Sequence, residues 1–514
     1  MLKQYRVKRL FEKTTLFSLT GWLGLLILLL AQLGFDYEAL PGLVAGCALV
    51  ASAAGVIGYA YSVKKSKPGG LRNLGIFHRS LSTRGVAGWL LGMALTALYV
   101  ILYFFPEMLG YGGGEAANTR LIGLFDPLSM ALKGQPASQW FVYGVLYTFA
   151  VVVFGLRFLI KYRHNRYQVI RTLSVMFFQF GFAFLLPEIL MRLQYPYYDA
   201  KNMWPLNYSF FDAWSLDGFL NSGAAGLLML LFGLVMIFVI SPVLTYFYGK
   251  RWYCSWVCGC GGLAETAGDP FRHLSSSSAG AWKLERWLIH SILVVVVIMT
   301  LGVLYSYFSD HSESLWVSRA FFVFAISILF MGLGIWVLTD RKRFKSLDPR
   351  ARNVALTVGA GCVLLLTVSH LAGGNRVLFV PVESLRSWYG FLIGAIFSGV
   401  IGVGFYPILG SRVWCRFGCP MAAILGIQQR FFSRFRITTN GGQCISCGNC
   451  TTYCEMGIDV RMYAQRGEDI LRASCVGCGI CSEVCPRGVL RLENGPVPET
   501  VGSSLVNHLL LSAR

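Results

Sequence analysis

Eight cysteines near the C-terminal end of the sequence have a spacing that can hold a metal cofactor. They form two runs of the same pattern, Cys-x2-Cys-x2-Cys-x3-Cys, and Pro486 directly follows the second run. Two-residue gaps let three thiolates from one tight loop reach three corners of a cubic iron–sulfur cluster, while the fourth thiolate comes from elsewhere. The eight residues are Cys444, Cys447, Cys450, Cys454, Cys475, Cys478, Cys481 and Cys485. The spacing therefore predicts two 4Fe–4S clusters.

The fourth cysteine of each run is expected to serve the other cluster, as it does in two-cluster proteins with these runs. Cluster one is accordingly assigned to Cys444, Cys447, Cys450 and Cys485. Cluster two is assigned to Cys475, Cys478, Cys481 and Cys454. Zinc sites need only two Cys-x2-Cys pairs, and a disulfide framework does not suit a reducing compartment, so both alternatives explain the two complete runs less well.

Five further cysteines lie in a repeated motif. Residues 249–258 and 410–419 both read Gly-x-Arg-x-aromatic-Cys-x3-Cys, and one more cysteine follows the first copy. If the x3 stretch is helical, cysteines at i and i+4 share one side of the helix, where they can ligate a metal or act as a redox dithiol. The five are Cys254, Cys258, Cys260, Cys415 and Cys419. A third cluster, a single metal ion and a dithiol relay all fit this pattern.

The composition places these motifs in a membrane protein. Of 514 residues, 55% are apolar and only 14% are charged, against roughly 25% charged in soluble domains. The mean hydropathy is +0.57, which argues against a soluble enzyme. Ten apolar runs approach the roughly 20 residues that a membrane-spanning helix needs. We expect spans near 15–35, 42–62, 86–105, 139–160, 172–192, 223–248, 287–307, 319–339, 353–372 and 387–409.

The basic residues predict the orientation of these spans. If ten helices cross the membrane, 37 of the 45 Lys and Arg residues fall in terminal and connecting segments on the same side of it. Segments rich in Lys and Arg are retained on the cytoplasmic side of a membrane. We therefore expect a multi-pass protein of the cell inner (cytoplasmic) membrane, with both termini, the clusters and the paired motifs on the cytoplasmic face. The net charge of +20 then follows from topology, and no nucleic-acid partner is needed to explain it.

The predicted fold class is an all-α polytopic membrane protein of about ten transmembrane helices, with a small α+β dicluster ferredoxin-like cytoplasmic domain. We divide the chain into an N-terminal five-helix membrane region, a membrane region with the paired motifs, a dicluster domain and a C-terminal tail. These regions are 1–222, 223–436, 437–495 and 496–514.

Three smaller features have competing interpretations. Loop 193–222, on the predicted outer side, is rich in Tyr, Trp and Phe; it suits an aromatic belt at the membrane interface, or else a docking surface or the mouth of a quinone pocket. Glu188 and Arg192 are spaced for an ion pair within one span, with a quinone or proton site as the alternative. Cys47 and Cys362 lie alone inside spans and are expected to be packing residues.

The combined motifs resemble those of a known family. The paired motifs, the stretch Cys419-Pro420-Met421-Ala422-Ala423 and the two-cluster segment resemble the membrane-bound 4Fe–4S polyferredoxins of nitrous-oxide reductase maturation, periplasmic nitrate reductase and cytochrome oxidase assembly systems. The resemblance covers roughly residues 223–490. It implies membrane-anchored electron transfer in support of a periplasmic or membrane metalloenzyme. The chain departs from the family at two positions, because Gly259 follows Cys258 and Glu455 follows Cys454 where those proteins have proline.

The predicted function is that of an electron-transfer iron–sulfur protein or oxidoreductase subunit. Single electrons would pass between a cytoplasmic donor or the membrane quinol pool and a membrane or periplasmic acceptor, through two 4Fe–4S clusters. Its partners would be a redox protein or a quinone, a metalloenzyme client and the lipid bilayer. The alternative is a metalloenzyme assembly or copper-reduction factor that uses the paired cysteines, because soft thiolates favour Cu(I).

Overall fold

The computed structural model describes residues 13–35, 37, 40–66, 82–113, 116–310, 318–340, 343–371, 376–377 and 380–495. Within them, ten helices are long and apolar enough to cross a membrane. Each of these helices overlaps one of the ten spans predicted from the sequence, so the predicted fold class is confirmed. The tail expected at 496–514 lies outside the described residues.

Seven of the spans are uninterrupted helices: α2 (Lys13–Gln32), α3 (Pro41–Ser66), α4 (Val86–Phe104), α7 (Gln139–Tyr162), α15 (Ala279–Asp310), α16 (Arg319–Thr339) and α17 (Pro349–Leu371). The other three contain a π-helical stretch. They are α8 (Arg166–Phe177) with Phe178–Leu185 and α9 (Leu186–Arg192), α11 (Gly223–Val235) with Met236–Ile240 and α12 (Ser241–Tyr248), and α18 (Val382–Tyr389) with Gly390–Ile401.

Short elements fill the connections between the spans. The short helices are α5 (Arg120–Gly123), α6 (Asp126–Lys133), α10 (Ala213–Asn221), α13 (Arg251–Cys254), α14 (Gly259–Thr266), α19 (Tyr406–Leu409) and α20 (Pro420–Phe432). Single helical turns occur at Pro106–Leu109, Tyr208–Phe211, Asp269–Leu274, Arg343–Ser346, Trp414–Gly418 and Gly441–Gln443. β1 (Arg376–Val377) pairs antiparallel with β2 (Val380–Pro381).

The surface of the helices suits hydrocarbon rather than water. In most of the ten spans under a third of the residues are buried, and large apolar side chains such as Trp22, Leu228 and Phe238 are about two-thirds exposed. Contiguous apolar surface on this scale marks a membrane or partner contact, while the helices satisfy their own backbone polar groups. The chain is therefore a multi-pass membrane protein.

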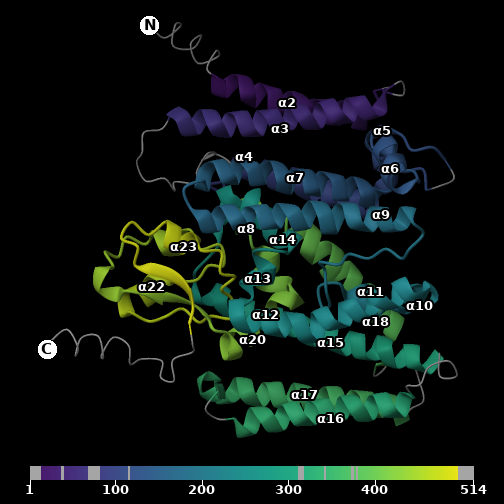
Figure 1. The fold of residues 1–514 in the computed structure, drawn as a ribbon, viewed down its shortest axis with the longest axis vertical. Helices are drawn as coiled ribbons and strands as arrows, with labels where there is room; N and C mark the ends of the chain where they lie inside the picture. Colours follow the sequence, from purple (N-terminus) through teal and green to yellow (C-terminus); the bar gives the residue numbers. More distant parts are fainter. Residues whose placement is uncertain are drawn as a thin grey trace.

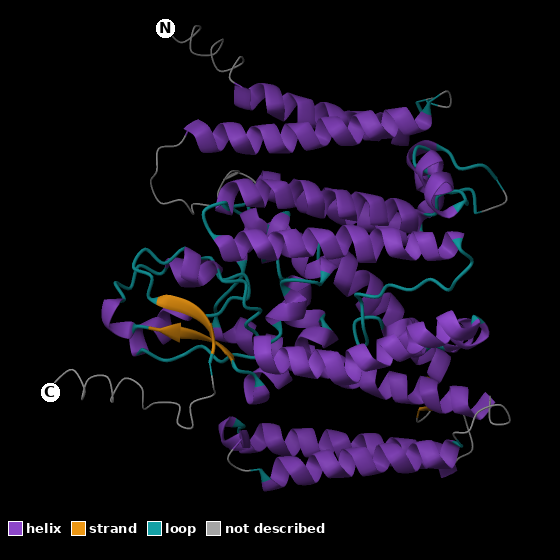
Figure 2. Cartoon of the chain, viewed as in Figure 1, coloured by secondary structure: helices purple, strands orange, loops and turns teal. Residues whose placement is uncertain are grey.

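The spans lie side by side, with the α2–α3 hairpin at one edge and the α16–α17 hairpin at the other (Figure 1). A small domain stands at one end of the helices and holds β3 (Phe435–Thr439), α21 (Asn449–Thr452), α22 (Val460–Arg466), α23 (Ile480–Glu483) and β4 (Leu490–Asn494). Its two strands pair antiparallel, from Phe435 opposite Asn494 to Thr439 opposite Leu490 (Figure 2). This pairing joins the two ends of the segment that carries both cysteine runs; we call it the ferredoxin-like domain.

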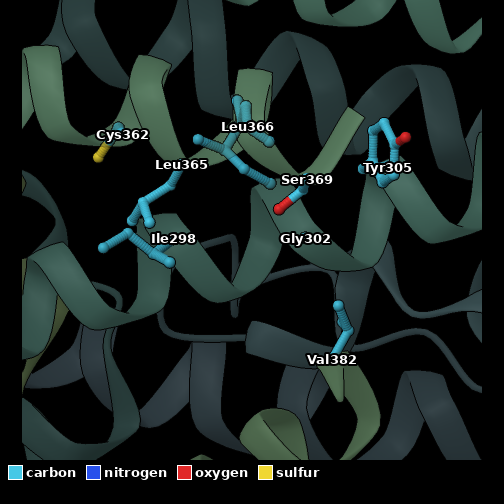
Figure 3. Close-up of a pocket in the computed structure, with 9 residues that line it drawn as sticks. Ile298, Gly302, Tyr305, Cys362, Leu365, Leu366, Ser369 and Val382 are labelled. Atoms are coloured by element: carbon cyan, nitrogen blue, oxygen red, sulfur yellow. The ribbon is translucent and has the colours of Figure 1, made fainter. Parts of the chain in front are cut away.

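A small cavity lies between α15 and α17, beside the start of α18 (Figure 3). Its lining is almost entirely apolar and includes Ile298, Leu365 and Cys362. Cys362 is buried there, as its interpretation as a packing residue requires, whereas Cys47 is exposed on the surface of α3. At one end of the cavity, the Tyr305 hydroxyl lies 3.3 Å from His370 Nδ1. Among the residues that the structure describes, no charged side chain lines this cavity, and we assign it to helix packing.

The orientation of the spans can be tested with cysteines in two exposed loops. Ala117 lies in the connection between α4 and α7, at the helix ends opposite the ferredoxin-like domain, and Arg163 lies between α7 and α8, at the near end. In intact cells, a membrane-impermeant maleimide should label Ala117→Cys but label Arg163→Cys only after permeabilisation, as judged by mass spectrometry of the two peptides. The reverse pattern would mean that the ferredoxin-like domain is outside the cell.

Candidate functional site

The cysteines assigned to cluster one share a cavity at the surface of the ferredoxin-like domain. Four cysteines and two arginines are among the residues that line it: Cys444, Cys447, Cys450, Cys485, Arg461 and Arg487. Cys447 is exposed, whereas Cys450 is buried. The last cysteine of the second run thus lies with the first three of the first run, which is the grouping that the crossed assignment requires.

The cysteines assigned to cluster two lie deeper. Cys475 and Cys481 are buried, and both lie near Cys454 of the first run, because the charge of Cys475 acts on Cys454 and the charge of Cys454 acts on Cys481. Burial raises the pKa of the Cys454 thiol to about 12. Gly477 and Gly479 adopt left-handed φ angles of +64° and +76°, a conformation that glycine allows without strain in a loop that must turn tightly. The pairing of cysteines with clusters stays a prediction.

The membrane region holds the loop of cluster two by four successive backbone carbonyls. The Cys475 carbonyl accepts a hydrogen bond from Gln429 Nε2 at 2.8 Å, and the Val476 carbonyl accepts one from Ser255 Oγ at 2.9 Å. The next two carbonyls accept bonds from Tyr167 Oη and Gln168 Nε2, both at 2.8 Å. Buried carbonyls need partners, so residues 475–478 fit one position on the membrane region. Ser255 directly follows Cys254, which brings this loop beside the paired motifs.

A buried ionic network lies beside this contact. Glu455 of the ferredoxin-like domain is fully buried and lies 2.7 Å from Arg272 Nη1 and 3.0 Å from Arg412 Nη2. Arg412 also pairs with Glu265, which in turn pairs with Arg171. Despite the cost of burial, the nearby arginines lower the pKa of Glu455, so it stays ionised. The network joins the ferredoxin-like domain to Arg412 of the second copy of the paired motif, and Arg412 also donates to the Cys254 carbonyl of the first copy.

The network continues towards the membrane helices through Asp269. This carboxylate lies 2.9 Å from Arg272 Nε and 2.7 Å from Lys161 Nζ. Burial alone would raise its pKa, but these two cations and Arg157 outweigh burial and lower it to about 2. The negative charge of Asp269 is therefore retained at any pH at which the protein functions.

The structure brings all five cysteines of the paired motifs into one packed region. Cys254, Cys258, Cys415 and Cys419 are buried in a single core, and Cys260 packs against it half-buried. The guanidinium of Arg412 reaches both copies, because Nη1 donates to the Cys254 carbonyl at 3.2 Å and lies 3.6 Å from Cys415 Sγ.

The thiols of this region differ in acidity. A hydrogen bond from Cys260 lowers the pKa of Cys258 to about 6, whereas burial raises that of Cys254 to about 12. Within the described residues, no group of three or more His, Cys, Asp or Glu side chains is placed to hold a single metal ion.

This cysteine region lies deeper than the sequence indicates. Both motifs were expected at the cytoplasmic face. Instead, a Cβ on Gly259 would collide with the side chain of Gln179, which is the middle residue of the 27-residue span Arg166–Arg192. The segment after α12 therefore folds back into the helix bundle. Its uncharged sequence from Trp252 to Ala264 permits this, but helix counting alone does not predict it.

Several residues of the site were not predicted. Gln429, Ser255 and Glu265 act through contacts between segments far apart in sequence, and nothing in their local patterns marks them. Loop 193–222 does expose aromatic side chains such as Trp214, as an aromatic belt would, yet Lys201 in the same loop is buried against Gln179.

The expected pairing of Glu188 with Arg192 is not formed between these two described residues. Arg192 donates to the Ala131 carbonyl, and the charge that acts on Glu188 is that of Lys133. The i+4 spacing alone therefore misidentified the partner of Glu188.

Removal of the Glu455 carboxylate should release the ferredoxin-like domain from the membrane region. In Glu455→Ala, Arg272 and Arg412 lose a buried partner, and breaking a buried pair typically costs about 3–5 kcal/mol. In the full chain, hydrogen exchange of the 475–478 amides should show that the free energy of local opening falls by about that amount. Glu493 is exposed on β4, and Glu493→Ala is the matched control. This variant should change the free energy of local opening by less than about 0.5 kcal/mol. Equal protection in both variants would contradict the role of the network.

Comparisons with known proteins agree with this geometry. A sequence model of the 4Fe-4S dicluster domain matches residues 443–490, which hold both cysteine runs. A model of the 4Fe-4S binding domain matches twice, at 230–277 and 390–438, so the predicted repeat of the paired motifs is confirmed.

A curated relative from Escherichia coli (strain K12), named "Putative electron transport protein YccM", is 25% identical over 227 residues. The alignment covers 44% of this chain and 46% of that protein, so it spans less than half of the relative's length. No solved structure matches the chain. Together with the ten apolar helices, these matches support a membrane protein of the 4Fe–4S ferredoxin type.

Proposed function

We propose that this chain moves single electrons from a cytoplasmic donor into the membrane through three iron–sulfur centres in series. The observation that carries the proposal is the capture of four successive carbonyls of loop 475–478 by the membrane region. That capture fixes the cysteines of cluster two beside Cys254. Electron transfer between centres needs a short and constant separation, and a fixed loop provides one.

The two predicted clusters of the ferredoxin-like domain differ in exposure. This difference supports an order in which electrons enter at cluster one and leave through cluster two. The cavity of cluster one includes the exposed Cys447 and two arginines, Arg461 and Arg487. The cysteines of cluster two face the membrane region instead. Cluster one is therefore the contact point for a soluble redox partner, and cluster two is the connection to the membrane region.

The paired motifs fit a third 4Fe–4S cluster, held by Cys254, Cys258, Cys415 and Cys419. The donor set has the right chemistry, because two buried thiols come from each copy of the repeat. Burial raises the pKa of the Cys254 thiol, but two buried cations, Lys250 and Arg412, act in the opposite direction and favour its ionised form. The sequence model that matches both copies is described as a 4Fe-4S binding domain. When bound, a 4Fe–4S cluster accepts and returns single electrons at a potential set by nearby charges, hydrogen bonds and exposure.

The acceptor belongs to the membrane or to its outer side. A quinone fits because it diffuses within the bilayer next to the deeply placed third centre, and a periplasmic or membrane metalloenzyme fits as the client of the family that the motifs resemble. The positive-inside pattern supports the inner membrane, with the ferredoxin-like domain in the cytoplasm.

Metal analysis and EPR of anaerobically purified protein test this proposal. Three clusters contain about twelve irons per chain. The double variant Cys254→Ser/Cys415→Ser, which removes one ligand from each copy of the repeat, should retain about eight irons and the EPR signals of the ferredoxin-like domain. The matched control Cys47→Ser/Cys362→Ser should retain all twelve.

Three other results would change the assignment. About eight irons in the unaltered protein would remove the third centre. If copper were also bound and were lost from the double variant, the paired cysteines would hold a metal for an assembly role. Fewer than four irons would overturn the two-cluster assignment itself.

A further inference from the structure

We propose that segment 199–203, which comes from the end of the helix bundle opposite the ferredoxin-like domain, forms the far wall of the paired-cysteine centre, and that Lys201 raises the redox potential of that centre. The inference rests on the proposed third cluster. It extends that proposal by assigning a positioning residue on loop 193–222, which the sequence indicated as an aromatic belt, a docking surface or the mouth of a quinone pocket.

Segment 199–203 reaches far into the bundle. It follows α9, which ends at Arg192, and Lys201 Nζ donates to Gln179 Oε1 at 2.7 Å. Gln179 precedes Arg192 by thirteen positions, which is at most about 20 Å along the helix axis at the rise of an α-helix. The Lys201 side chain is 5% exposed. The chain therefore turns back from the far end of the bundle and places an ammonium group beside the middle of a membrane span.

The same ammonium group lies against the paired-cysteine motif. A Cβ on Gly259 would come within 2.6 Å of Lys201 Nζ, so the backbone directly after Cys258 is in contact with this charge. The Tyr253 hydroxyl lies 3.4 Å from Asn202 Oδ1, and Met203 packs in the same core as the cysteines. Lys201 thus contacts the residue that follows the first copy of the motif, Asn202 contacts Tyr253 within that copy, and Met203 belongs to the same core.

A local turn fixes the position of Lys201. Asp199 accepts a hydrogen bond from the Lys201 backbone N–H at 3.3 Å and another from Asn202 Nδ2 at 2.5 Å. The Lys201 side chain is bonded to an amide oxygen rather than to a carboxylate. The group that holds the ammonium is thus neutral, and the nearby Asp199 carboxylate offsets its charge only in part. The ammonium itself lies against the backbone directly after Cys258.

The charge of Lys201 favours the reduced centre. An added electron makes the centre one unit more negative, and a cation held nearby in a poorly screened site stabilises that state. Charges and hydrogen bonds around a cluster are the groups by which a protein sets its potential. Removal of the ammonium group should therefore make the centre harder to reduce.

The experiment measures the midpoint potential of the centre in the full chain, by EPR-monitored redox titration of the signal that Cys254→Ser/Cys415→Ser removes. Lys201→Met should shift this potential to a more negative value, and Lys201→Arg, which keeps the charge, should restore most of the difference. The potentials of the two clusters in the ferredoxin-like domain should stay unchanged in both variants. Lys133→Met removes another buried lysine at the far end of the helices, on α6, and should leave all three potentials unchanged.

The possible failures are distinguishable. An unshifted potential in Lys201→Met, in protein that retains about twelve irons, would overturn the role of Lys201 and leave the proposed function standing. An equal shift in Lys201→Met and Lys201→Arg would mean that packing, and not charge, sets the potential. About eight irons in the unaltered protein would remove the third centre and this inference with it.

Discussion

Arg412 is the side chain on which the arrangement of the site depends. Its guanidinium contacts the backbone beside one copy of the cysteine motif, a thiol of the other copy, Glu265 of the membrane region and Glu455 of the ferredoxin-like domain. A planar guanidinium has five donors in fixed directions, so it can join several partners only if all of them are in place. Burying such a group is expensive, and a buried ion pair contributes more to a specific arrangement than to net stability. The position of the ferredoxin-like domain is therefore specified by buried charge together with the four carbonyl hydrogen bonds of residues 475–478.

Depth is the second constraint on function. A centre at the membrane surface would leave most of a hydrocarbon layer about 30 Å thick between it and the far side. Gly259 instead lies beside the middle residue of a span, and Lys201 reaches the same point from the far end of the bundle. In the proposed route, cluster two approaches the paired cysteines from one side, and the chain of segment 199–203 approaches them from the other. In this route, the distance from the paired-cysteine centre to an acceptor on the far side is therefore shorter than the full thickness of the hydrocarbon layer.

The sequence predicted the features that depend on local patterns. Ten apolar runs became ten spans because length and hydropathy decide membrane insertion, and the cysteine runs were recognisable because three ligands of each cluster come from one loop. The crossed place of Cys485 beside Cys444 followed from a known motif. The depth of Cys258 and the burial of Lys201 could not be predicted, because they depend on segments that fold back into the bundle. Glu188 shows the same limit: an i+4 spacing suggested Arg192, whereas the tertiary structure brings Lys133 near.

The two departures from the family pattern have a common physical explanation. Pro420 follows Cys419 and begins α20, a position where proline suits a helix. The equivalent position in the first copy is Gly259, and any larger residue there would collide with Gln179 and Lys201. Proline is also absent after Cys454, where Glu455 instead extends a carboxylate to Arg272 and Arg412. Each departure thus occurs where this chain adds a contact to the paired-cysteine region, one from the far end of the bundle and one from the ferredoxin-like domain. The two residues that differ from the family pattern, Gly259 and Glu455, therefore make the contacts that join the paired-cysteine region to segment 199–203 and to the ferredoxin-like domain. A continuous electron route would depend on these contacts.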